Sequence, residues 1–173
     1  MTQQVLLIED DAAVRNALCQ TLELAEYNVI ACSAFIEAKD HISAEFSGVV
    51  LTDIRMPGRD GFFVLDHVLG CDHELPVVML TGEGDIPMAV RAIGRGAFDF
   101  LEKPCAPDAL LPSIERALRQ RELILENRVL RAQVTKVDPA ARMVFGRSEL
   151  VNALRDKIRL AAKSGADVLV YGE

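Results

Sequence analysis

Residues 5–11 read VLLIEDD, a run of four apolar residues followed directly by three acids. A short, continuous apolar run of this kind is typical of a strand that is buried on both faces of a parallel sheet. Comparable runs recur within the first 105 residues, at positions 29–31, 49–51, 77–80 and 98–101.

Amphipathic stretches separate these apolar runs. Two of them carry apolar stripes at helical spacing, one made of Val14, Leu18, Leu22 and Ala25, the other of Met88, Ala89, Ala92 and Ile93. Strands that alternate with helices at this spacing predict right-handed βαβ units. We therefore expect an α/β fold with a five-stranded, doubly wound parallel sheet, which places functional sites at the carboxyl ends of its strands.

From Pro107 to about Lys136 the sequence predicts one long helix. Pro107 suits the first helical turn, and Asp108 complements the positive end of the helix dipole. Two sets of residues in this stretch follow heptad spacing and predict a coiled coil, in which Asn127 favours a parallel dimer. The sets are Leu111, Leu118 and Leu125, and Leu123, Asn127, Leu130, Val134 and Val137. The alternative is a helix that packs on its own domain.

The last part of the chain predicts a further, incomplete domain. Asp138 and Pro139 break the long helix, and Ser148 is placed to cap a shorter one. That second helix carries Val151, Leu154, Ile158 and Ala161 on one face. Residues 167–171 predict a buried strand that runs into Gly172 and Glu173. Because residues 146–173 are too few to fold alone, we expect a domain that is cut off midway.

Charge is distributed unevenly along the 173 residues, whose net charge is −7. Residues 1–105 carry 7 Lys and Arg against 17 Asp and Glu, so this part is poorly suited to binding nucleic acid. No apolar run approaches the ~18 residues of a membrane-spanning helix, and a signal peptide pattern is absent from the first residues. Four cysteines without metal-ligand spacing fit a reducing compartment. We expect a cytoplasmic protein without a membrane partner.

Acidic side chains follow two of the predicted strands. Glu9, Asp10 and Asp11 come after the first strand, and Asp53 follows the third. Neighbouring parallel strands bring these ends together, where each pair of carboxylates repels by about 4 kcal/mol at ~4 Å in an effective dielectric of ~20. Oxygen ligands with several open coordination positions predict a Mg²⁺ site.

Two other strand ends supply complementary groups. Thr81 ends the fourth strand with a hydroxyl, and Lys103 follows the fifth with an ammonium group. Each residue alone has a simpler structural explanation, including a helix cap for Asp11. Together, a carboxylate, a metal site, a hydroxyl and a lysine predict an aspartyl-phosphate site.

The motifs at these strand ends resemble the receiver domain of two-component response regulators, and the resemblance covers about residues 1–120. The segments that carry it are residues 6–11, 52–58, 81–82 and 103–104. The resemblance implies that Asp53 accepts the phosphoryl group and that Asp10 binds Mg²⁺ directly. The backbone carbonyl of Arg55 would complete the protein ligands, and Glu9 would act through a bound water molecule.

The same resemblance assigns roles in signalling. Thr81 and Phe100 would form the family's switch pair, and Lys103 would bind the phosphate. The implied partners are a sensor histidine kinase and a second copy of the chain, bound through the linker helix and the receiver face.

Further segments are similar to those of one subfamily, the nitrogen-regulator and C4-dicarboxylate-regulator type. They are residues 82–90, 96–100 and 126–131. Residues 145–148 and 168–173 resemble the opening of a σ54-activating AAA+ ATPase, whose glycine-lysine phosphate loop the sequence does not include. Glu83 and Cys105 depart from the subfamily pattern, which has His and Phe there.

The resemblance implies three regions: a receiver at 1–120, a coiled-coil linker at 121–140 and the start of an AAA+ domain at 141–173. In a full-length protein, ATP, σ54 RNA polymerase and DNA would be further partners, and phosphorylation would change dimer geometry to control the ATPase. The chain itself would be a phosphoacceptor with self-catalysed phosphotransfer and dephosphorylation, not an enzyme of the usual kind.

Other functions fit the sequence less well. An aspartate-based phosphatase usually carries a second acid two residues after its nucleophile, where this chain has Arg55. A nucleotide-binding fold needs a glycine-rich loop after the first strand, where this chain has acids. A degenerate receiver that serves only as a dimerisation module remains the alternative.

Overall fold

The computed structural model describes residues 3–82, 86–136, 144, 146 and 148–164. Internal contacts divide the chain into two compact units, Met1–Glu126 and Asn127–Glu173, which we describe separately. Three predictions lie outside the described residues: the strand at 167–171, the break of the long helix at Asp138 and Pro139, and the departure from the subfamily pattern at Glu83.

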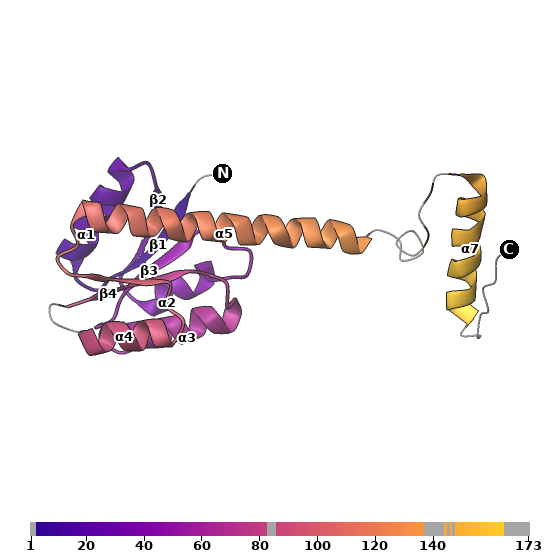
Figure 1. The fold of residues 1–173 in the computed structure, drawn as a ribbon. Coiled ribbons are helices and arrows are strands. Elements are labelled where there is room, and N and C mark those ends of the chain that lie inside the picture. Colours follow the sequence, from indigo (N-terminus) through magenta and orange to yellow (C-terminus); the bar gives the residue numbers. More distant parts are fainter. Residues whose placement is uncertain (1–2, 83–85, 137–143, 145, 147, 165–173) are drawn as a thin grey trace. The chain divides into compact units, whose positions relative to one another are not determined.

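The first unit is built on a five-stranded parallel sheet, as the sequence predicts (Figure 1). The strand order is β2-β1-β3-β4-β5. The strands are β1 (Gln4–Ile8), β2 (Asn28–Cys32), β3 (Val49–Asp53), β4 (Val77–Thr81) and β5 (Asp99–Glu102). Each observed strand overlaps the apolar run that predicts it.

Helices cover both faces of this sheet (Figure 1). One face packs against α1 (Ala12–Leu24) and α5 (Pro107–Lys136). The other packs against α2 (Phe35–Ala38), α3 (Gly61–Cys71) and α4 (Ile86–Gly94), with a short 3-10 turn, η1 (Lys39–His41), after α2.

Successive side chains of the central strands enter opposite cores. In β1, Val5 and Leu7 face the α1/α5 core, whereas Leu6 and Ile8 face the other. All four side chains are fully buried. This double burial explains why the strands are apolar throughout instead of alternating with polar residues.

The predicted helical stripes are confirmed in part. Leu18 and Leu22 of α1 are buried, and so are Ala89 and Ala92 of α4. Ile93, which the stripe also includes, is 45% exposed and leaves an apolar surface on α4.

The long predicted helix is confirmed as α5, but half of its heptad pattern has another cause. Leu118 is buried in the α1/α5 core, and Leu111 packs against that core. These two leucines pack on their own domain, as the alternative predicts, and Leu125, the third of the set, is partly buried. The helical period brings them to the sheet because a buried face and a coiled-coil seam repeat almost equally.

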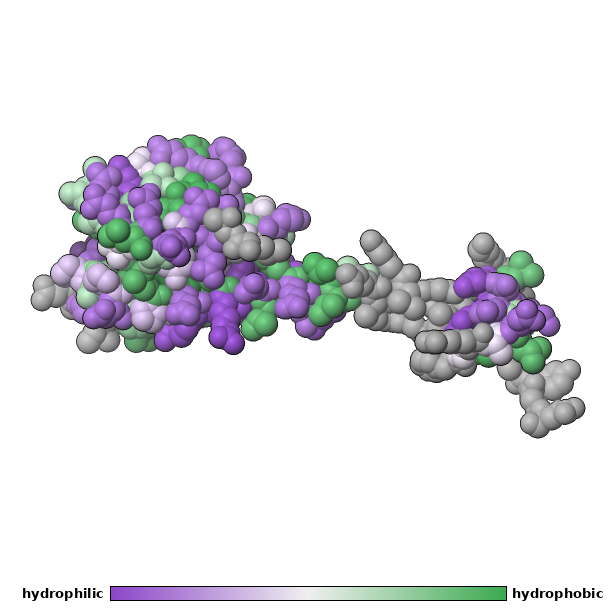
Figure 2. Space-filling view, turned by 90° about the horizontal axis from the view of Figure 1, so that it is seen from above, coloured by the Kyte–Doolittle hydropathy of each residue, from purple (hydrophilic) through white to green (hydrophobic). Residues whose placement is uncertain are grey.

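Beyond Leu118, α5 carries apolar side chains on its surface. Leu123, Val129 and Leu130 are each more than half exposed. Apolar patches interrupt the hydrophilic surface along this part of the helix (Figure 2). The described residues show no partner for it, so the coiled coil stays a prediction; the side chain of Val134 and all of Val137 lie outside the described part.

A buried arginine anchors α5 at the edge of the sheet opposite to the carboxyl ends. Arg121 is fully buried, and its guanidinium donates to Asp72 Oδ2 at 2.7 Å. It also donates to the carbonyl oxygens of Phe46 at 2.9 Å and Ala44 at 2.8 Å. A single side chain of α5 thereby joins the end of α3 to the loop before β3.

Gly61 fixes the distance between α3 and the end of β3. An added Cβ at Gly61 would lie 2.2 Å from the carbonyl oxygen of Asp53 and 2.8 Å from the Cα of Ile54. The Gly61 amide also donates to the Ile54 carbonyl at 2.9 Å. Any side chain here would push α3 away from the strand end that carries Asp53.

In the second unit, α7 (Glu149–Ser164) is the short helix that the sequence predicts. The Val151 amide donates to the Ser148 hydroxyl at 3.4 Å, so Ser148 occupies the predicted capping position. Val151, Ile158 and Ala161 are partly buried, whereas Leu154 is 38% exposed.

Replacing the buried arginine tests the anchor of α5. Arg121→Met leaves the Asp72 carboxylate buried without its cation, so we expect a loss of about 3–5 kcal/mol in the free energy of unfolding, measured by urea denaturation. Arg119→Met, at an exposed position on the same helix, serves as the control and should change stability by less than about 0.5 kcal/mol. Arg121→Met/Asp72→Leu should recover part of the loss; equal stability of the two Arg→Met variants would contradict this role.

Substitutions at two glycines of α3 should have opposite effects. Gly61→Ala should destabilise the fold by about 1–3 kcal/mol, because the new methyl group overlaps backbone atoms of β3. Gly70→Ala meets no atom within 4 Å and should stabilise the helix by about 0.5–1 kcal/mol. Urea denaturation of both variants measures the difference, and a neutral or stabilising Gly61→Ala would show that the close approach is unimportant.

Candidate functional site

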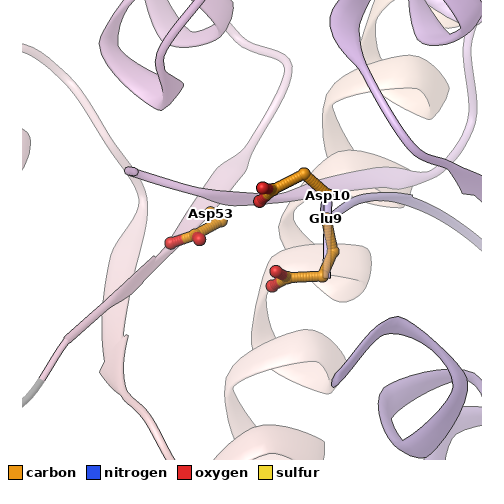
Figure 3. A group of neighbouring side chains, drawn as sticks. All are labelled: Glu9, Asp10 and Asp53. Atoms are coloured by element: carbon orange, nitrogen blue, oxygen red, sulfur yellow. The ribbon is translucent and has the colours of Figure 1, made fainter. Parts of the chain in front are cut away.

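Three carboxylates meet at the carboxyl edge of the sheet. Glu9 and Asp10 directly follow β1, and Asp53 is the last residue of β3. The parallel register pairs Ile8 with Thr52, which brings the next residues of both strands alongside each other. One oxygen from each carboxylate lies within 4.8 Å of the others (Figure 3). The structure therefore assembles the acid cluster that the sequence predicts.

A lysine that is distant in the sequence but lies at the same edge of the sheet compensates part of this negative charge. Lys103 follows β5, and its backbone amide donates to the Thr81 carbonyl at 2.8 Å. Its Nζ lies 2.6 Å from Glu9 Oε2 and 2.8 Å from Asp53 Oδ2. The ammonium group thus bridges two carboxylates from neighbouring strands. The peptide bond between Lys103 and Pro104 is cis.

Burial and charge shift the proton affinities of this group of residues. Burial raises the pKa of the Glu9 carboxyl, although the hydrogen bond and positive charge of Lys103 oppose that shift. Burial alone would lower the pKa of the Lys103 ammonium. The hydrogen bonds that it makes with Asp53 and Glu9, together with their negative charges, outweigh this effect, so the pKa of Lys103 is raised. The lysine therefore stays charged in the folded protein.

The third acid of the run has a structural task. Asp11 is the N-cap of α1, where its Oδ1 accepts from the amides of Ala13 at 2.8 Å and Val14 at 3.1 Å. These backbone hydrogen bonds lower the pKa of Asp11. The Asp11 carboxylate thus caps the helix and is not part of the acid cluster, although its backbone amide donates to Glu9 Oε1 at 3.3 Å.

Arg15 contacts the same segment and was not singled out by its sequence pattern. Its guanidinium donates to the carbonyl oxygens of Glu9 at 2.6 Å and Asp10 at 3.1 Å. The only sequence feature that could have indicated this contact is a basic residue in the first turns of a helix that follows an acidic run. Only the path of the backbone shows that it contacts carbonyl groups instead of the carboxylates.

The two residues of the expected switch pair lie on neighbouring strands. Thr81 is buried at the end of β4, and its hydroxyl is 3.4 Å from the Gly82 carbonyl. Phe100 lies on β5, opposite Met79 in the register, and is 41% exposed. Arg55, whose backbone carbonyl is the remaining expected ligand, follows β3 with an exposed side chain.

Cys105, where the subfamily pattern has Phe, stays close to the site without joining it. Its Sγ donates to the Glu102 carbonyl at 3.2 Å, and it packs against the α1/α5 core. Burial raises the pKa of this thiol. The smaller side chain thus fills an apolar position beside Lys103.

The donor set fits a magnesium ion. The cluster offers carboxylate oxygens from Glu9, Asp10 and Asp53, two of them buried and one exposed. The Oε2 atom of Glu9 is buried and faces the Lys103 ammonium, 2.6 Å away. Mg²⁺ prefers oxygen ligands of this kind and keeps several water molecules.

None of the described helices is both long and apolar enough to cross a membrane.

Residues 5–115 match the family model of the response regulator receiver domain.

Relatives and solved structures agree with this match. The chain is 43% identical over 169 residues to the C4-dicarboxylate transport transcriptional regulatory protein DctD of Rhizobium meliloti, covering 98% of the chain and 36% of that protein. It is 35% identical to the transcriptional regulatory protein FixJ of Bradyrhizobium diazoefficiens, covering 89% of the chain and 76% of that protein. The chain thus spans little more than a third of DctD but most of FixJ.

Among solved structures, NtrX from Brucella abortus matches 94% of the chain with a TM-score of 0.68 and 32% identity, and the match covers 34% of the NtrX chain. Full-length FixJ from B. japonicum matches 97% of the chain with a TM-score of 0.66 and 30% identity, covering 93% of the FixJ chain. With its parallel sheet, its acid cluster and these matches, the chain belongs to the response regulator receiver domain family.

Proposed function

We propose that residues 1–120 form a receiver that accepts a phosphoryl group from a sensor histidine kinase on Asp53. The observation that carries this proposal is the juxtaposition of Asp53 with Glu9, Asp10 and Lys103 at one sheet edge. Asp53 is 6% exposed, so only a small part of this residue is open to an incoming phosphoryl group. Membership of the family supports the assignment.

The phosphotransfer uses the Asp53 carboxylate as the nucleophile. One carboxylate oxygen attacks phosphorus in line, the new O–P bond forms, and the bond between phosphorus and the histidine nitrogen of the kinase breaks. Lys103 Nζ lies 2.8 Å from Asp53 Oδ2 and is placed to stabilise charge on the phosphoryl oxygens.

The metal site belongs to the same proposal. Asp10, Asp53 and the backbone carbonyl of Arg55 would hold Mg²⁺, with Glu9 acting through a water molecule. When bound, Mg²⁺ supplies positive charge that offsets the repulsion between the carboxylates and the phosphoryl oxygens.

Phosphorylation would be transmitted through Thr81 and Phe100. A phosphoryl group on Asp53 adds about −1.5 to −2 charge beside the strand that ends at Thr81. The Thr81 hydroxyl would turn toward it, and Phe100, which is partly exposed, would move into the space that is freed. The surface of α4, β5 and α5 would thereby change.

Residues 121–173 would convert this surface change into a change in the geometry of a dimer. Residues 121–140 would form a coiled-coil linker, and residues 141–173 would begin an AAA+ ATPase domain. In a full-length protein of the DctD and NtrX type we expect σ54-dependent control of transcription that uses ATP and DNA. The receiver would itself bind no nucleic acid and act in the cytoplasm.

Incubation with acetyl phosphate and Mg²⁺ tests the phosphoacceptor. Intact-mass spectrometry should show one phosphoryl adduct, because acetyl phosphate also carries a transferable phosphoryl group: its P–O bond breaks and acetate leaves, in place of the histidine nitrogen of the kinase. Asp53→Asn and an EDTA-treated sample should each lose the adduct, since one lacks the nucleophile and the other the metal.

Asp40→Asn is the matched control, because this exposed residue of η1 lies outside the acid cluster. It should be phosphorylated as the unaltered chain is. If no adduct forms while a known receiver is labelled in parallel, the phosphoacceptor role is wrong and the chain is better explained as a dimerisation module.

Substitution of α5 tests the proposed dimer. Leu130→Asp places a charge in the expected seam; losing two leucines per dimer costs about 3 kcal/mol or more. We expect about a hundredfold increase in the dimer dissociation constant, measured by analytical ultracentrifugation. Leu24→Asp, at a leucine of α1 that is 87% exposed, is the control. If Leu130→Asp leaves the dissociation constant unchanged, the dimer interface lies elsewhere.

A further inference from the structure

The three consecutive acids after β1 enter three different environments. Glu9 is buried against Lys103, Asp10 is exposed beside Asp53, and Asp11 caps α1. The Glu9 amide donates to the Cys32 carbonyl at 3.1 Å, which continues the pairing of β1 with β2. Glu9 and Asp10 therefore lie in the short connection between the end of β1 at Ile8 and the start of α1 at Ala12.

Arg15 holds these carbonyl groups from the helix. It lies in the first turns of α1 and is partly buried, and its Nη1 donates to Glu9 O at 2.6 Å and to Asp10 O at 3.1 Å. The guanidinium is planar and charged at every accessible pH, so its ability to donate these hydrogen bonds does not depend on pH.

We propose that Arg15 is a positioning residue for the metal site, which fixes the backbone of Glu9 and Asp10 so that the Asp10 carboxylate stays beside that of Asp53. The proposal rests on the proposed function of this cluster as a Mg²⁺ site. It assigns to Arg15 an effect that passes through the backbone and not through contact with the ion.

Arg15 affects Mg²⁺ affinity in two opposite ways, through the position of the acid pair and through its own positive charge. The Arg15 guanidinium carries a positive charge and lies within hydrogen-bond distance of the backbone of Glu9 and Asp10, so its charge is close to the acidic segment. A cation near a cation site weakens metal binding by repulsion. Removing Arg15 would therefore tighten Mg²⁺ binding if charge were its main effect, and weaken it if positioning dominates.

Titration calorimetry of the full chain with Mg²⁺ distinguishes the two effects. For Arg15→Met, which keeps the length and loses both hydrogen bonds, we expect the Mg²⁺ dissociation constant to rise about tenfold or more, the usual effect of removing a residue that orients metal ligands. Arg15→Lys keeps the charge and part of the hydrogen bonding, so its Mg²⁺ dissociation constant should lie between those of the unaltered chain and Arg15→Met. Arg119→Met, an exposed arginine of α5, should leave it unchanged.

Hydrogen exchange of the metal-free protein gives a second and independent measurement. Arg15→Met should accelerate exchange of the amides of residues 9–11 and leave those of β4 unchanged. Slower, unchanged or uniformly faster exchange would overturn the positioning role, and so would an unchanged or tighter Mg²⁺ dissociation constant. If the unaltered chain binds no Mg²⁺, the proposed metal site fails, while the exchange measurement still decides whether Arg15 fixes the acid pair.

Discussion

The repulsion between carboxylates at one edge of the sheet is the constraint around which this receiver is arranged. Glu9, Asp10 and Asp53 place their oxygens within 4.8 Å of one another, and two of these side chains are buried. The Lys103 ammonium, held between Glu9 and Asp53, offsets part of the negative charge. The remaining negative charge and the oxygen donors make this cluster chemically suited to Mg²⁺.

A rigid scaffold is needed to keep such a cluster together. The strands that carry it are buried on both faces, so their ends cannot relax away from each other without opening two cores. Gly61 allows α3 to begin in contact with the backbone of Asp53, and Arg15 contacts the backbone of the acid pair from α1. Helices on opposite faces of the sheet therefore both contribute to the position of the carboxylates.

The helix α5 combines two environments in one continuous element. Its first half completes a core through Leu110, Ile114 and Leu118, and Arg121 closes this half with a buried ion pair to Asp72. Beyond that point, exposed leucines and a valine replace buried ones. The buried half and the exposed apolar half of α5 therefore meet different surroundings within one helix.

The sequence by itself determined the five strands, the helices α1 and α4, the extent of α5 and the residues of the acid cluster, because short apolar runs, helical stripes and strand-end acids are local patterns. It did not separate the leucines of α5 into core and surface, since a buried helical face and a coiled-coil seam repeat with nearly the same period. Nor did it reveal the contacts of Arg15, Gly61 and Arg121. Each depends on backbone atoms that only the tertiary structure brings near, and a backbone carbonyl has no signature in the sequence.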